Sequence, residues 1–120
     1  MTASPSATKG KVVLVPFPFD DLTTTKVRPA ICLTDAIGLH RHVVLAFVTS
    51  RTPTVILPTD IVLDPAQADF GNTGLRVQST IRLHRLMTLP TTMMVRQLGV
   101  LPHGTHQRVI VALHRLFAAT

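Results

Sequence analysis

The sequence predicts a single, mainly β domain: a small barrel of antiparallel strands with helices closing one side. About five or six short runs of β-branched and apolar residues are bounded by turn residues. They follow one another without the long crossovers that parallel strands require, so antiparallel pairing is expected. An amphipathic stretch at helical spacing ends the chain. With 120 residues, of which 46% are apolar, the chain can build one core but not two.

The first two strands are expected to form a hairpin. Val12–Phe19 and Pro29–Leu33 are apolar and rich in β-branched or aromatic residues, and the polar loop DDLTTTKVR joins them. Arg28 lies where this loop returns to the sheet, and the proline that follows biases it toward an extended backbone. A rigid scaffold therefore holds a charged, fork-shaped hydrogen-bond donor at the mouth of the hairpin.

Three further strands follow the hairpin. Val43–Ser50 is a continuous apolar run that ends in hydroxyl residues, and Thr59–Leu63 is a short strand that Asp64-Pro65 stops. In Leu75–Leu89 apolar and polar residues alternate, which is typical of a half-exposed strand.

Two helices are expected after these strands. Pro90-Thr91-Thr92 offers an N-cap for a short helix over Met93–Leu98, which Gly99 would close. The last element begins at Gly104-Thr105 and carries an apolar stripe at helical spacing. The stripe consists of Val109, Ile110, Leu113, Leu116 and Phe117.

Positive charge is concentrated in the C-terminal half. Twelve Lys and Arg residues oppose six Asp and no Glu, for a formal net charge of +6. The last acid is Asp69, so residues 1–69 balance six bases against six acids, and residues 70–120 carry six Arg and no acid. This pattern favours an anionic partner, either nucleic acid or an acidic protein segment. The alternative is that the excess of Arg serves only solubility.

Composition also bounds the setting of the protein. No apolar run approaches the roughly 20 residues that span a bilayer, and the first residues lack the pattern of a signal peptide. Cys32 has no second thiol to pair with and is interpreted as a buried core residue. These features indicate a cytoplasmic protein. Residues 1–9 are expected to be a flexible tail, and residues 10–120 the domain.

The familiar constellations of catalytic residues have no clear signature in the sequence, although a Ser/His/Asp triad stays open. Two close pairs of histidines lack a third ligand, so neither a metal nor another cofactor is expected. There is no GxSxG elbow and no glycine-rich phosphate loop. What remains is a set of Arg, Thr, Ser and His residues at strand ends. Such a set suits transesterification of RNA, because the substrate's own 2′-hydroxyl is the nucleophile and a fixed Arg can stabilise the charge on the phosphate.

Four motifs of the chain resemble those of one known family. The segment GKVVLVPFPFDDLTTTKVRPAICLT is similar to the family's opening, and Phe47–Ser50 to its third strand. Gly74-Leu75 through Ser79, continuing to Thr88-Leu89, resembles its Gly-Leu-x-x-x-Ser strand. Gly99–Leu101 before the final helix matches its tail. The chain thus resembles the MazF/PemK toxin ribonucleases of toxin–antitoxin pairs, from about Gly10 to Ala118 and in one order.

This resemblance implies an SH3-like barrel of the CcdB/PemK type and a homodimer. It implies a toxin that cleaves single-stranded RNA without a metal and with sequence selectivity, leaving 2′,3′-cyclic phosphate and 5′-hydroxyl ends. It implies inhibition by a cognate antitoxin, expected to carry an acidic disordered segment. The family's catalytic Arg matches Arg28, and its strand-ending Thr matches Thr49.

Further residues are expected to bind the substrate around this pair. Some family members use a carboxylate in the strand that Gln78–Arg85 matches, but this chain has none there. Arg82 and His84 are expected to share one face by alternation, to contact phosphate and to assist proton transfer. The expected substrate-binding residues are Asp20, Lys26, Ser50, Arg51, Ser79, Arg82 and His84.

Alternatives stay open at this point. Arg28 could pair with Asp20 or Asp21 across the hairpin, and Thr49 could be an ordinary strand end. The whole chain could be a toxin of the same barrel that binds DNA gyrase without catalysis, or a plain RNA-binding barrel. The absence of Trp and Tyr argues against the last of these, because few aromatic rings remain for base stacking.

Overall fold

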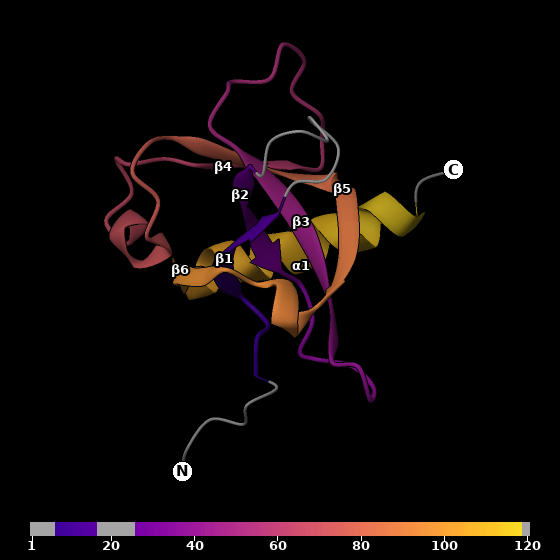
Figure 1. Cartoon of the computed structure of the whole chain (residues 1–120). Helices are drawn as coiled ribbons and strands as arrows, with labels where there is room; N and C mark the ends of the chain where they lie inside the picture. Colours follow the sequence, from indigo (N-terminus) through magenta and orange to yellow (C-terminus); the bar gives the residue numbers. More distant parts are fainter. Residues whose placement is uncertain (1–6, 17–25, 119–120) are drawn as a thin grey trace.

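The computed structural model describes residues 7–16 and 26–118 of the chain. Within these residues six strands, two 3₁₀ turns and one α-helix follow one another (Figure 1). The strands are β1 Lys11–Pro16, β2 Val27–Cys32, β3 His42–Thr49, β4 Asp60–Leu63, β5 Ser79–Pro90 and β6 Arg96–Val100. The 3₁₀ turns are η1 Phe70–Thr73 and η2 Thr91–Met93, and the helix is α1 His103–Ala118.

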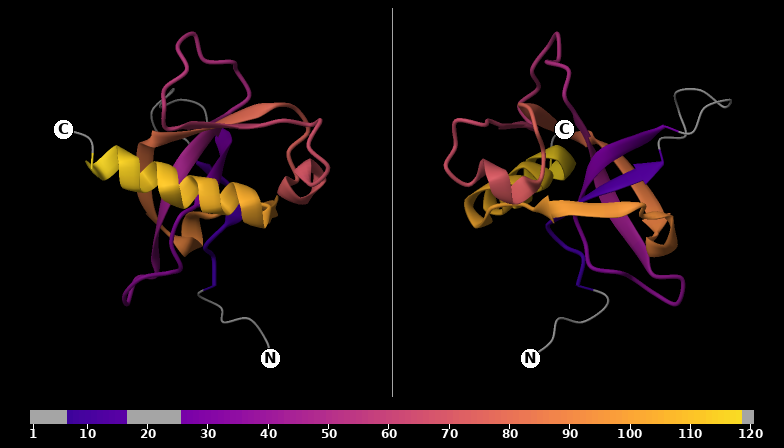
Figure 2. Two further views of the ribbon diagram at one scale, coloured as in Figure 1. Left: turned by 180° about the vertical axis from the view of Figure 1, so that it is seen from behind. Right: turned by 60° about the vertical axis from the view of Figure 1, so that its left-hand side comes forward.

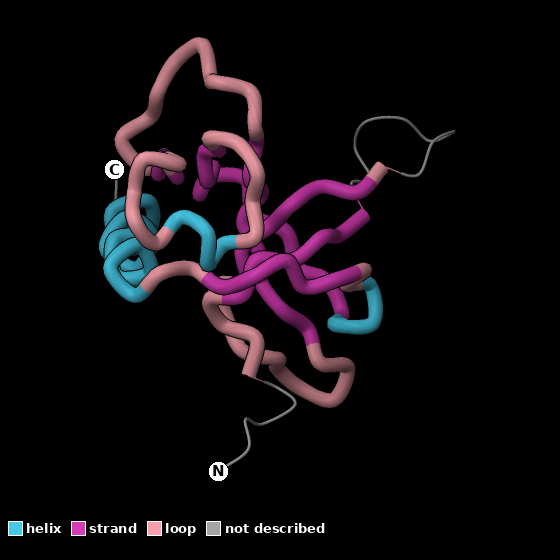
Figure 3. Tube along the Cα trace, turned by 90° about the vertical axis from the view of Figure 1, so that its left-hand side faces the viewer, coloured by secondary structure: helices cyan, strands magenta, loops and turns pink. Residues whose placement is uncertain are grey.

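The six strands form one antiparallel sheet in the order β4-β5-β3-β2-β1-β6. The sheet curls into a half-barrel, and α1 runs across one of its faces (Figure 2, left). Figure 3 shows α1 nearly end-on at one side of the strands. The predicted mainly β, antiparallel fold with a C-terminal helix is confirmed. Among the described residues, no helix has the length and apolar character needed to cross a membrane.

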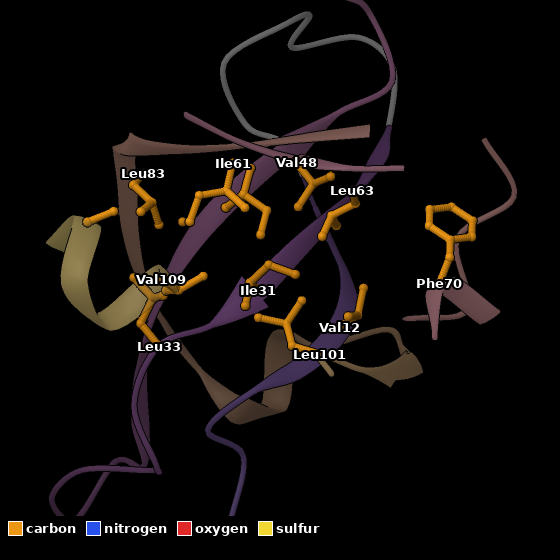
Figure 4. Packing of buried hydrophobic residues seen from close by; sticks show 13 residues of the cluster. Val12, Ile31, Leu33, Val48, Ile61, Leu63, Phe70, Leu83, Leu101 and Val109 are labelled. Carbon is orange, nitrogen blue, oxygen red and sulfur yellow. The ribbon is translucent and has the colours of Figure 1, made fainter. Parts of the chain in front are cut away.

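Alternate residues of the strands supply two separate core clusters, one on each face of the sheet. On the face that α1 covers, Val12, Ile31 and Val48 pack with Val109 of the helix (Figure 4). On the other face, Val13, Ala30, Leu45 and Phe47 form the second cluster. Both clusters include residues of the central strands β1, β2 and β3, so these strands are fixed from both sides.

Strand β5 bends where its pairing with β3 changes register. Ala46 pairs with Leu86, but the next residue of β3, Phe47, pairs with Arg82. Residues 83–85 of β5 therefore have no partner in β3, and such an insertion bends and twists a strand. The first part of β5 pairs with β4 as well as β3, and this part carries Ser79 and Arg82.

The predicted short helix over Met93–Leu98 is wrong. Thr91–Met93 is a 3₁₀ turn, and the chain then continues as β6, which pairs with the edge of β1. The N–H of Val95 donates to the carbonyl of Leu14 at 2.8 Å and begins this pairing. Backbone bonds to an open sheet edge decide the outcome, because a six-residue helix has little stability of its own.

Thr8 and Lys9, which the sequence analysis placed in the flexible tail, are bonded to the rest of the domain. Thr8 is buried, and the N–H groups of Thr8 and Lys9 both donate to Oδ1 of Asp35 at 3.0 Å. The Thr8 hydroxyl donates to the carbonyl of Thr34 at 2.8 Å. These bonds fasten the segment before β1 to the segment that follows β2. Cys32 is a free, buried cysteine, as expected.

Candidate functional site

A cavity of about 780 Å³ opens where four parts of the chain meet: the start of β2, the end of β3, the loop before β5 and the first part of β5. Figure 1 shows this end of the sheet, from which the loop after β3 projects. The lining consists of Lys26, Arg28, Pro29, Phe47, Val48, Thr49, Ser50, Arg51, Leu75, Arg76, Val77, Ser79, Arg82 and Arg85.

Arg28 of β2 and Thr49 of β3 lie near the same end of these two neighbouring strands. The β2–β3 pairs run from Cys32–Leu45 to Ala30–Phe47, and Arg28 and Thr49 each lie two residues beyond the last pair. Both residues line the cavity. The predicted neighbourhood of the two residues is therefore present, and Arg28 is exposed.

The hydroxyl of Thr49 is held in one orientation. Its oxygen accepts a hydrogen bond of 3.1 Å from the N–H of Arg51, two residues further along the chain. A hydroxyl that accepts a bond in this way keeps its own hydrogen for donation. Thr49 is half-buried, whereas Ser50 and Arg51 are exposed on the rim.

Arg82 is fixed by a carboxylate that the sequence analysis did not single out. Nε of Arg82 donates to Oδ1 of Asp60 at 3.1 Å across the β4–β5 pair. The Asp60 side chain is fully buried, and that of Arg82 is 21% exposed. The two residues are 22 positions apart, and only strand pairing brings them together.

The register change in β5 alters which side chains reach the cavity. Arg82 and Arg85 line it, and His84 does not. The expectation that Arg82 and His84 share one face is thus corrected, because residues 83–85 have no partner in β3 and simple alternation fails there. Arg85 instead lies over the ring of Phe47, with its guanidinium carbon 5.9 Å from the ring centroid.

The remaining predicted residues are placed as follows. Lys26 lines the cavity and is exposed. Ser79 also lines it, but it is buried and its hydroxyl donates to the carbonyl of Val77 at 2.9 Å. Asp20 lies outside the described residues, and so does the possible pairing of Arg28 with Asp20 or Asp21. Arg76 and Arg85 line the cavity although the sequence analysis did not select them.

The charged side chains that line the cavity are all positive among the described residues. Six cationic side chains line it, and no carboxylate or histidine does so among the described residues. These cations are Lys26, Arg28, Arg51, Arg76, Arg82 and Arg85. Such a concave cationic surface attracts a polyanion and holds phosphate groups by charge-assisted hydrogen bonds. The described residues also contain no group of three His, Cys, Asp or Glu side chains placed to hold a metal ion.

Comparison with known proteins assigns the family. A model of the PemK-like, MazF-like toxins of type II toxin–antitoxin systems matches residues 8–117. The chain belongs to this family. A search of curated protein sequences found no match.

Solved structures of MazF toxins share the fold of this MazF/PemK protein. The Mycobacterium tuberculosis toxin MazF-mt6 has a TM-score of 0.65 and 21% identity, with 89% of this chain and 95% of that chain covered. MazF from Deinococcus radiodurans has a TM-score of 0.68 and 23% identity, with 95% and 98% covered. A mycobacterial endoribonuclease in complex with its cognate antitoxin has a TM-score of 0.65 and 18% identity, with 93% and 95% covered.

Proposed function

We propose that this MazF/PemK toxin is an endoribonuclease that cleaves single-stranded RNA at the cationic cavity. The observation that carries the proposal is the presence of both Arg28 and Thr49 in the lining of a cavity with six cations and no acid among the described residues. Sugar–phosphate chains are polyanions that such a concave cationic surface suits. The mycobacterial endoribonuclease of the same fold supports the same reaction class.

In the proposed reaction the 2′-hydroxyl of one nucleotide attacks the adjacent phosphorus atom. The bond from the 2′-oxygen to phosphorus forms, and the bond from phosphorus to the 5′-oxygen breaks. One proton leaves the 2′-oxygen and one reaches the 5′-oxygen, so none is gained or lost. The products end in a 2′,3′-cyclic phosphate and a 5′-hydroxyl.

Arg28 and Thr49 would act on the charge that develops at phosphorus. A guanidinium at a strand start donates to the non-bridging oxygens, whose charge grows in the transition state. The Thr49 hydroxyl, oriented by the N–H of Arg51, donates to the same group. Since the described lining residues include no histidine or carboxylate, stabilisation of charge is the main contribution expected from this cavity.

The same cavity also suits a protein partner. An acidic, disordered antitoxin segment could fold over the cations and exclude RNA. This partner is proposed because a mycobacterial endoribonuclease and a Deinococcus radiodurans MazF of this fold were solved with antitoxins. We further propose a homodimer that acts in the cytoplasm, where its RNA substrate is found.

The test is incubation of the purified protein with a long RNA transcript in EDTA. Wild-type protein is expected to cut the RNA and leave 2′,3′-cyclic phosphate and 5′-hydroxyl ends. Arg28→Ala and Thr49→Val each remove one donor to the phosphate and should lower the rate about 10²–10³-fold. Arg108→Ala removes the same charge from the exposed surface of α1 and should cut normally.

Two outcomes would contradict the proposal. One is intact RNA with wild-type protein, and inhibited DNA gyrase in a parallel assay would then support the gyrase-binding alternative. The other is undiminished cleavage by Arg28→Ala, which would place the reaction elsewhere.

A further inference from the structure

A buried carboxylate lies behind the cavity at the start of β4. The side chain of Asp60 is fully buried, and each of its two oxygens accepts one hydrogen bond. Oδ1 accepts from Nε of Arg82 at 3.1 Å, and Oδ2 accepts from the N–H of Leu57 at 2.8 Å. A buried charge is costly unless it is paired in this way, so the carboxylate fixes the two groups that it contacts.

The contact at Nε determines how Arg82 faces the cavity. A guanidinium has five N–H donors in a rigid plane, and Asp60 uses the one at Nε. The two terminal nitrogens make no hydrogen bond within the described part of the chain, and Arg82 lines the cavity. A guanidinium that is held at Nε and presents its two terminal nitrogens can donate to two oxygens of one phosphate group.

Neighbouring strands keep this side chain in place. Phe47, Arg82 and Asp60 are direct cross-strand partners on β3, β5 and β4, so their side chains lie on one face in a row. Arg85 covers Phe47 beside them. Arg82 therefore has fixed neighbours on both sides within the sheet.

The second oxygen links the same carboxylate to the loop between β3 and β4. The N–H of Leu57 donates to the Asp60 side chain, and the N–H of Asp60 donates to the carbonyl of Leu57 at 3.0 Å. These two bonds close the end of the loop that begins with Ser50 and Arg51, two residues of the cavity rim.

We infer that Asp60 is a positioning residue, which orients Arg82 to bind a phosphate group of the RNA next to the Arg28–Thr49 pair. The inference rests on the proposed function, because it assigns Asp60 and Arg82 to the RNA substrate. It adds a carboxylate that does not touch the substrate and acts only through the arginine.

A double-mutant cycle tests whether Asp60 acts through Arg82. Asp60→Asn keeps an oxygen for Leu57, but it removes the charge and can turn an N–H₂ group toward Nε of Arg82. Asp60→Asn and Arg82→Gln are each expected to lower kcat/KM for a long RNA transcript about tenfold, as one charge-assisted contact is lost. The double variant should be no slower than Arg82→Gln alone.

Arg82→Lys separates orientation from stability. Lysine keeps the charge that Asp60 needs, but its single ammonium cannot bond the carboxylate and present a fork to the cavity at once. Arg82→Lys is therefore expected to unfold at nearly the wild-type temperature and still show the loss in kcat/KM. Should Arg82→Lys cleave like the wild type, the orienting role of Asp60 is excluded.

Binding to RNA that cannot be cut keeps the inference separate from the proposed function. A 2′-O-methyl RNA of mixed sequence lacks the nucleophile but keeps its phosphates. Asp60→Asn and Arg82→Gln are each expected to reduce the slope of log affinity against log salt by about 0.7, the value for one phosphate contact on a single strand. Unchanged slopes, or a further tenfold loss on adding Asp60→Asn to Arg82→Gln, would overturn the inference alone. If wild-type protein neither cuts RNA nor binds the 2′-O-methyl RNA, the proposed function itself fails.

Discussion

Arg28 and Thr49 are distant in sequence, and both line one cavity because β2 and β3 are neighbouring antiparallel strands. Pro29 follows Arg28 and favours an extended backbone for it, and Arg28 pairs with Val15 of β1. The Thr49 hydroxyl is oriented by a bond to the N–H two residues ahead, which is a local interaction of the kind that Thr forms at turns. Local sequence features thus help to determine the conformation of both residues.

Cys32 allows a prediction of how stability depends on pH. Burial raises the pKa of its thiol to about 11, although the charge of Lys11 acts in the opposite direction. In the unfolded chain the thiol ionises near its ordinary pKa of 9.0. Between these values the folded state binds more protons, so the free energy of unfolding should fall as pH rises, by on the order of 2 kcal/mol at pH 11.

Denaturant unfolding of wild type and Cys32→Ala from pH 8 to 11 measures this effect. The variant should be less stable at pH 8 because the smaller side chain leaves a void in the core. Its free energy of unfolding should fall less steeply than that of the wild type above about pH 9. The chain has no Tyr, which removes one other group that ionises in this range. Parallel curves for the two proteins would contradict the prediction.

At the scale of elements, β6 packs closely against η1 at two glycines, Gly99 of β6 and Gly74 directly after η1. A Cβ added at Gly99 would collide with the backbone carbonyl groups of Asn72 and Thr73. Backbone cannot yield as a flexible side chain does, so Gly99→Ala is expected to lower the free energy of unfolding by roughly 1–3 kcal/mol or more. Gly104 is the matched control, since nothing lies within 4 Å of its added Cβ and it is part of α1.

Gly104→Ala should be neutral or stabilising by up to ~1 kcal/mol, because alanine favours the helix. Denaturant unfolding compares both variants with the wild type. Equal stability of Gly99→Ala and Gly104→Ala would show that β6 and η1 separate at no cost.

The elements also show which parts of the structure the sequence can predict. Apolar periodicity located β1 to β5 and α1, because each of these segments carries its own pattern. β6 was missed because its strand pairing depends on the edge of β1, which a local reading of Met93–Leu98 does not contain. Arg85 lines the cavity where His84 was expected, because the shift in the β3–β5 register interrupts the alternation.

Asp60 was missed for a related reason. Its two contacts depend on the pairing of β4 with β5 and on the closure of the preceding loop, and neither is visible as a motif. The position of Arg28 and Thr49 at one cavity could be predicted, because two short motifs of one family contain them. The residues that support the pair depend on the tertiary structure.

At the scale of the whole molecule, half of the positively charged residues gather in one cavity. Six of the twelve Lys and Arg residues line one cavity, and they come from both halves of the sequence. Residues 1–69 are neutral overall, yet they supply Lys26, Arg28 and Arg51 to it. The fold, more than the charge asymmetry of the sequence, therefore creates the cationic site.

This concentration of charge predicts a steep dependence of RNA affinity on salt. Each phosphate that the protein neutralises on a single strand contributes about 0.7 to the slope of log affinity against log salt. Contact of the cavity with three or more phosphates gives a slope steeper than about −2, measurable by titrating 2′-O-methyl RNA at several salt concentrations. Arg76→Ala, on the lining, should reduce the slope by about 0.7, whereas Arg108→Ala, on α1, should leave it unchanged. An affinity independent of salt, or equal slopes for the two variants, would mean that the cavity does not hold the RNA backbone.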